Sequence, residues 1–206
     1  NLNDAMLYEL SKDPGEIVSI TEKESKVEST NSNELYPTLM PTSDFVMTVV
    51  AQRISERSGD NFKFTATGDW KASPTWEFTD SIALGWSDNF TLYSDYSYMY
   101  GYDVNGAQTL YPGTRNSVKA ETGVGHNVSL RPGITDDKAV LVAKVYKNAS
   151  SGTANVVAEY GHVQLTASVT GISFGAGGGS APTIGFSVDW NSKIEEAVPA
   201  YDDFSY

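Results

Sequence analysis

Cysteine is absent from this chain of 206 residues. A disulfide framework, a zinc–thiolate site, an iron–sulfur cluster and a thiol nucleophile are therefore excluded. Histidine is scarce, since His126 and His162 are the only two. Neither belongs to a metal-binding or catalytic sequence motif, so each is expected to be a surface or hydrogen-bonded histidine.

Basic residues and long apolar runs are also in short supply. Lysine and arginine total 14 against 26 acidic residues, which gives a formal net charge of −12. The basic patches of a nucleic-acid-binding protein are missing. No apolar run approaches the ~20 residues of a membrane span. A secreted, extracellular protein is expected, and a first residue Asn1 in place of methionine fits removal of a signal peptide.

What is present, from Asp44 to Trp190, is a succession of segments with the period of a β-strand. About nine strands with no internal helix pattern predict an antiparallel β-sandwich or jelly roll, with a closed barrel as the structural alternative. Residues 80–86 and 89–102 are predicted to pair as a hairpin around Ser87, and residues 163–174 to form one strand. The glycine-rich residues 175–180 lack the lysine and helix of a phosphate loop.

Residues 1–37 differ from this pattern, with eight acidic and three basic residues. We interpret them as an acidic N-terminal arm that precedes a β-sandwich domain of residues 38–206. Leu2, Met6 and Leu10 recur at helical spacing, and Pro14-Gly15 ends the pattern, which predicts a short helix. Residues 16–27 carry Ile17, Val18, Ile20 and Val27 among charged residues, a pattern that suits an edge strand or a peptide laid along a surface.

Either the arm packs on its own domain, or it adds a strand to a neighbouring subunit. Self-association into an oligomer or filament is the favoured hypothesis, because unpaired strand edges offer a docking surface. The residues predicted to form the interface are Ile17, Val18 and Ile20. The protein is thus expected to be a non-enzymatic extracellular structural or binding protein whose partner is itself.

Aromatic residues are concentrated between positions 70 and 102, and every second residue from Tyr96 to Tyr102 is tyrosine. In a strand these four side chains share one face. An exposed row could stack on sugar rings, which makes glycan binding through Trp76, Tyr96, Tyr98 and Tyr100 an alternative function. A ladder of cross-strand pairs over the rim of a core is the structural alternative.

A second alternative is a glycoside hydrolase, in which Glu77 and Glu159 would be the paired carboxylates. Both have apolar or aromatic neighbours that could raise a carboxyl pKa. A Ser-His-Asp site is neither indicated nor excluded by spacing. No cofactor is expected, although a structural calcium ion is an alternative, because oxygen ligands are plentiful. The candidate ligands are Asp80, Asp88, Asn89, Asp95, Asp103, Asp136, Asp137, Asp202 and Asp203.

Two segments carry a resemblance to known sequences. Residues 151–162 (SGTANVVAEYGH) and 79–86 (TDSIALGW) resemble a group of uncharacterised secreted β-proteins from Gram-positive bacteria. The resemblance implies secretion and implies no activity, cofactor or site residue. It also argues against use of the glycosylation sequons at Asn89, Asn127 and Asn148.

Overall fold

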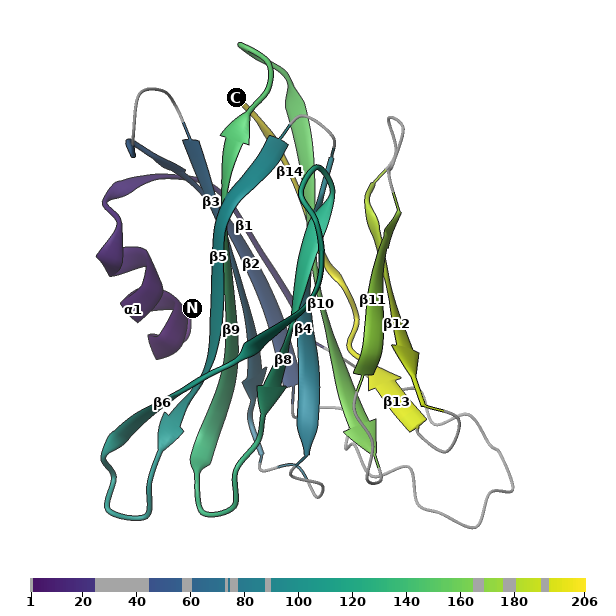
Figure 1. Cartoon of the computed structure of the whole chain (residues 1–206). Helices are drawn as coiled ribbons and strands as arrows, with labels where there is room; N and C mark the ends of the chain where they lie inside the picture. The colour runs from purple at the N-terminus through teal and green to yellow at the C-terminus, as the bar shows by residue number, and fades with distance from the viewer. Residues whose placement is uncertain are drawn as a thin grey trace.

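The computed structural model describes residues 2–24, 45–56, 61–72, 74, 78–87, 90–164, 169–175, 181–189 and 193–206 (Figure 1). These residues form one helix and fourteen strands. In chain order they are α1 (Asp4–Lys12), β1 (Gly15–Glu24), β2 (Phe45–Ile54), β3 (Asn61–Trp70), β4 (Thr79–Trp86), β5 (Phe90–Tyr102), β6 (Gln108–Pro112), β7 (Thr114–Lys119), β8 (Gly123–Ser129), β9 (Thr135–Lys147), β10 (Thr153–Gln164), β11 (Val169–Gly175), β12 (Thr183–Val188), β13 (Lys193–Glu196) and β14 (Ala200–Ser205). Within these ranges, no helix has the length and apolar character needed to cross a membrane.

The strands form three sheets. Sheet A has the order β1-β2-β3-β9-β5-β6, and sheet B has the order β13-β10-β4-β8-β7, with β14 paired to β10. Sheet C is the β11-β12 hairpin. All strand pairs described are antiparallel. The predicted all-β antiparallel sandwich with a short N-terminal helix is therefore confirmed.

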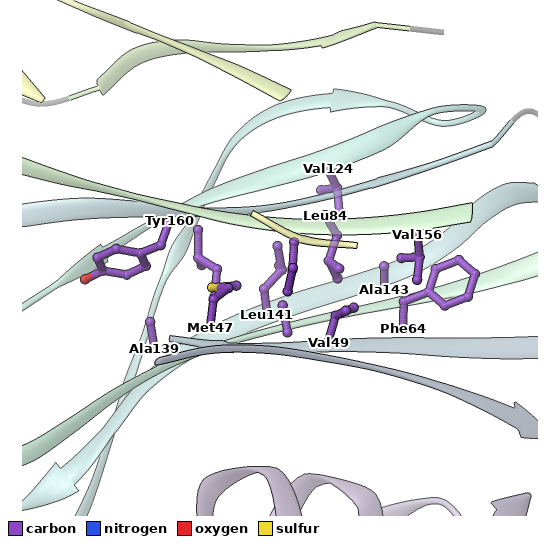
Figure 2. Packing of buried hydrophobic residues seen from close by; sticks show 14 of the residues in the cluster. Met47, Val49, Phe64, Leu84, Val124, Ala139, Leu141, Ala143, Val156 and Tyr160 are labelled. Carbon is purple, nitrogen blue, oxygen red and sulfur yellow. The ribbon is translucent and has the colours of Figure 1, made fainter. Parts of the chain in front are cut away.

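The main core lies between sheets A and B and follows the two-residue period of the strands (Figure 2). In β3, Phe64 and its alternate neighbours point into the core, where they meet Leu84 of β4 and Val156 of β10. All three are fully buried. Alternate residues of β2, β3 and β9 point to the opposite, outer face of sheet A, and most of these are buried as well. Another layer must therefore cover the outer face.

Helix α1 lies over β3 and β9 on this face, and its sequence explains both of its ends (Figure 1). The side chain of Asn3 caps the N-terminus by accepting a 2.8 Å hydrogen bond from the backbone N–H of Met6. Pro14 follows the last turn, as predicted. The chain then enters β1, the predicted edge strand, which pairs with β2 of the same chain. The described part of the arm thus packs on its own domain.

Some predicted elements are wrong. β4 and β5 do not form a hairpin, because β4 belongs to sheet B and β5 to sheet A. The turn signal near Ser87 therefore marks a crossing between sheets. The single strand predicted over residues 163–174 is also wrong, since β10 extends through Val163 to Gln164 and a separate strand, β11, begins at Val169. Strands β6, β7, β13 and β14 were not predicted. They are only four to six residues long and largely polar, which leaves too few positions for a clear apolar alternation.

Candidate functional site: a tyrosine and lysine face beneath the N-terminal helix

The four alternating tyrosines lie on one face of β5, the outer face of sheet A, as the strand period requires. The neighbouring strands β3 and β9 add lysines to the same face. We call this surface the tyrosine–lysine face; it consists of Tyr96, Tyr98, Tyr100, Tyr102, Lys63, Lys138 and Lys144. Carboxylates of α1 and of the residue that follows it bind this face.

Glu9 is the centre of the contact and is fully buried. Its carboxylate accepts hydrogen bonds from the hydroxyls of Tyr96 and Tyr98, the latter at 2.8 Å. Lys12, one turn further along α1, donates to the same carboxylate at 2.9 Å and lies over the ring of Tyr98. The ammonium of Lys63 is 4.0 Å from Glu9 Oε1. A buried carboxylate is tolerated here because it has several donors and nearby positive charge.

Asp4 and Asp13 fix the two ends of the helix. Asp4 accepts a 2.8 Å hydrogen bond from the hydroxyl of Tyr102 and lies 3.3 Å from the ammonium of Lys138. Asp13 binds Lys63 at 2.9 Å and Lys144 at 3.0 Å. Each carboxylate of this helical region therefore meets a cation of the tyrosine–lysine face.

The pKa values respond to these contacts. Burial alone would raise the pKa of Asp4, but the hydrogen bond from Tyr102 and the charge of Lys138 hold it below the usual range. For Asp13, Lys63 and Lys144 likewise outweigh burial and lower the pKa. Burial and the carboxylate of Glu9 raise the pKa of Tyr98. The tyrosines are thus neutral hydrogen-bond donors, and the aspartates are anions at neutral pH.

The residues predicted to bind glycans divide into two groups. Trp76 lies outside the described residues. Tyr96 is partly buried, whereas Tyr98 and Tyr100 are only 7% and 4% exposed. The glycan-binding alternative requires exposed rings on one face, and helix α1 covers this face.

The residues predicted to form an interface lie on β1. Ile17 and Ile20 are 42% and 48% exposed, whereas Val18 is partly buried against the main core. A bulge between Ile17 and Ser19 shifts the register, so that Val18 turns toward the core. Two of the three therefore present apolar surface to solvent in the single chain.

Both histidines have acidic partners that are distant in the sequence. His126 Nε2 lies 2.7 Å from Asp95 Oδ1, and His126 Nδ1 lies 2.8 Å from Ser97 Oγ. Arg115 also binds Asp95, and burial would raise the pKa of Asp95 but His126 and Arg115 lower it. The order Ser-His-Asp is that of a hydrolase triad, but Ser97 is only 6% exposed. The cluster joins β5 of sheet A to β7 and β8 of sheet B.

The second histidine lies in a buried cluster of the main core. The carboxylate of Asp80 lies 2.9 Å from His162 Nδ1 and accepts hydrogen bonds from the hydroxyl of Tyr160 at 2.5 Å and the backbone N–H of Val163 at 2.9 Å. Trp70 donates to the hydroxyl of Tyr160 at 3.3 Å. The prediction that each histidine is a hydrogen-bonded histidine agrees with these contacts.

Of the predicted carboxylate pair, Glu77 lies outside the described residues. Glu159 is 6% exposed, and burial followed by the charge of Glu196 raises its pKa to about 7. Gly161, two residues beyond Glu159, pairs directly with Glu196, so both carboxylates lie on the outer face of sheet B. Among the candidate calcium ligands that the structure describes, no group of three acidic or histidine side chains is close enough to hold a metal ion.

Sequence reasoning missed Glu9, Lys63 and Lys144, which organise the tyrosine–lysine face. The only available signal was indirect, namely lysines on strands whose adjacent residues are apolar, as Phe62 and Phe64 are beside Lys63. Their pairing with the arm joins segments that are far apart in the chain, and no local pattern predicts it.

No protein-family model matches the chain. No curated protein matches it either. Solved structures with a similar arrangement include a pore forming protein, with a TM-score of 0.40 and 9% identity over 89% of this chain and 94% of that one. Others are the Clostridium perfringens delta-toxin (TM-score 0.38, 8% identity, 92% of each chain) and the KRT10-binding region domain of the pneumococcal serine rich repeat protein PsrP (TM-score 0.37, 14% identity, 72% of this chain and 87% of that one). Similarities of this size carry no argument about what the chain does, and they place it in no family.

Proposed function

We propose that this chain is a non-enzymatic extracellular structural or binding module that associates with copies of itself by exchanging its N-terminal arm. One observation carries the proposal: Asp4, Glu9 and Asp13 each meet a lysine or tyrosine of the tyrosine–lysine face. Every copy has the same arm and the same face. An arm docked on a neighbour would make the same contacts as an arm docked on its own domain.

The charges of the face favour continuous occupation by an acidic segment. Lys63 is fully buried, and Lys138 and Lys144 have side chains that are 4% and 13% exposed. Buried ammonium groups are costly without a paired anion. Residues 25–44 separate β1 from β2, and a segment of that length can span at most roughly 65–70 Å. That reach is compatible with docking on a neighbouring copy.

The extracellular placement rests on sequence. The resemblance of residues 79–86 and 151–162 to secreted β-proteins supports it, and so does the acidic composition. The clusters around His126 and His162 are buried in the sandwich, which supports a structural role for both.

The test is a pair of complementary charge reversals. Asp13→Lys places a positive charge beside Lys63 and Lys144, and Lys144→Asp places a negative charge beside Asp13 and Glu56. Either change alone should weaken docking of the arm on the tyrosine–lysine face when every chain in the sample carries the same substitution. Mixing the two variants brings the new lysine at position 13 of one chain opposite the new aspartate at position 144 of the other. Heterodimers should therefore outnumber homodimers by roughly tenfold in native mass spectrometry.

The matched control reverses two exposed charges outside the arm contact, Lys119→Asp and Glu121→Lys. This pair should show no preference for heterodimers. Light scattering on the unmodified chain establishes whether it associates at all. A monomer at every concentration, together with a mixture that forms no heterodimer, would refute arm exchange.

A further inference from the structure

The two sides of the sandwich are closed differently. On one side β6 pairs with β5 of sheet A, and β7, which follows it directly, pairs with β8 of sheet B. One continuous stretch of chain thus joins the sheets. On the other side sheet A ends at β1, while β14 lies on the edge of sheet B next to it. Within the described residues, no backbone hydrogen bond joins β1 to β14. We call this second side the open side.

The open side retains unused hydrogen-bonding capacity. β1 pairs only with β2 among the described strands, so alternate N–H and C=O groups along its other edge face outward. Two side chains at the edges also have polar atoms that are not used in hydrogen bonds. Ser19 Oγ on β1 and Asp202 Oδ2 on β14 are shielded from solvent and have no hydrogen-bond partner among the described residues. A shielded carboxylate oxygen without a donor is unfavourable, and an added donor would relieve that cost.

The exposed charge on the open side is mainly negative, which favours a positively charged partner. Glu22 and Glu24 on β1 and Asp203 on β14 are exposed acidic residues, against which β1 supplies only Lys23. Like charges on facing strands are unfavourable, so two copies of this chain would repel each other at these edges. A strand with positive side chains would be attracted instead.

We propose that the open side accepts one extended basic peptide segment of a partner protein, which adds as a strand to the free edge of β1. Alternate side chains of such a strand point to opposite faces. Apolar side chains on one face would cover Ile17 and Ile20, which are exposed on β1. A lysine or arginine on the opposite face would reach toward Asp202. The proposal does not depend on arm exchange, because among the described strands β1 pairs only with β2, whichever copy supplies that β2.

The probe is a ten-residue peptide of alternating lysine and valine. Calorimetry should detect binding at low salt that weakens as salt is added, because exposed charges are screened. Hydrogen exchange should show new protection at amides of β1. A matched peptide, N-methylated at every residue, keeps the charges but has no backbone N–H group with which to complete the ladder on either edge. It should bind at least tenfold more weakly.

Two variants of the full chain complete the test. Asp202→Asn and Asp203→Asn should each lower the affinity by roughly threefold, whereas the control Glu121→Gln, in a turn away from the open side, should leave it unchanged. Absence of binding at low salt would overturn the proposal. Equal binding of the N-methylated peptide would also overturn it, because attraction without strand addition gives that result. Protection confined to strands other than β1 would be a third contrary outcome.

Discussion

Glu9 is the central residue in the docking of α1, because its buried carboxylate binds Tyr96, Tyr98 and Lys12. Replacing Glu9 with glutamine removes the charge but keeps the shape. We expect docking of α1 to weaken by roughly 2 kcal/mol, because hydrogen bonds to charged groups contribute about that much. Hydrogen exchange of the α1 amides measures the change directly. The control is Glu16→Gln, whose ion pair with Arg53 is exposed, and an equal effect of both changes would contradict the assignment.

Glu159 introduces a pH dependence of the opposite sign from that of the arm aspartates. Its pKa is raised to about 7 in the folded chain, so the folded state binds more protons than the unfolded state between about pH 4 and 7. The free energy of unfolding should therefore fall as pH rises through this range, by up to about 3 kcal/mol. Urea unfolding of Glu159→Gln should show a flatter profile. Glu121→Gln, at an exposed position, should keep the original slope.

At the scale of elements, Gly113 connects β6 to β7 where the chain passes from sheet A to sheet B. A Cβ atom at this position would overlap Ser97 Oγ and would lie 2.7 Å from the carbonyl oxygen of Asn127. We expect Gly113→Ala to destabilise the fold by roughly 2 kcal/mol, because forced overlap in a packed region costs about 1–3 kcal/mol. The control is Gly171→Ala on β11, where the added methyl group meets open space. Thermal unfolding of both variants tests the difference.

The elements that the sequence predicted best have a strong local signal. Helix α1 combines apolar residues at helical spacing with a capping Asn3 and a terminating Pro14, and each of these acts within one or two turns. The two-residue period of β2 and β3 is equally local. The hairpin predicted around Ser87 failed because a turn signal gives no information about which sheet the chain enters next.

The candidate site was predictable only in part. The shared face of the four tyrosines follows from strand geometry, so Tyr96 to Tyr102 could be placed together. Their cover could not be predicted, because Glu9 and Tyr98 meet across 89 positions of sequence. The partner of His162 could not be predicted for the same reason, since Asp80 lies 82 positions earlier in the sequence. Such contacts depend on the packing of whole sheets.

At the scale of the whole molecule, acid should release the arm. The folded pKa values of Asp4 and Asp13 lie below their ordinary values, so their contribution to docking is present above about pH 4 and is lost as pH falls through the folded values. We expect hydrogen exchange to show loss of α1 protection as pH falls below the ordinary pKa range of aspartate, while the strands of the main core stay protected. The double variant Asp4→Asn, Asp13→Asn should show weak docking at every pH. Simultaneous loss of α1 and the core strands would contradict a separable arm.

The unequal sides of the sandwich have a mechanical consequence. A load applied through the N-terminus first meets the contacts of α1 with the tyrosine–lysine face and then the single backbone ladder that joins β1 to β2. The opposite side has no comparable weak point among the described strands. There β6 of sheet A and β7 of sheet B follow each other directly in the chain, so one continuous stretch of backbone joins the two sheets. Under tension the arm should therefore peel away while the sandwich remains folded, since regions with fewer buried contacts open at lower cost. The molecule would then yield in two steps, with the detached arm acting as a reversible extension of the chain.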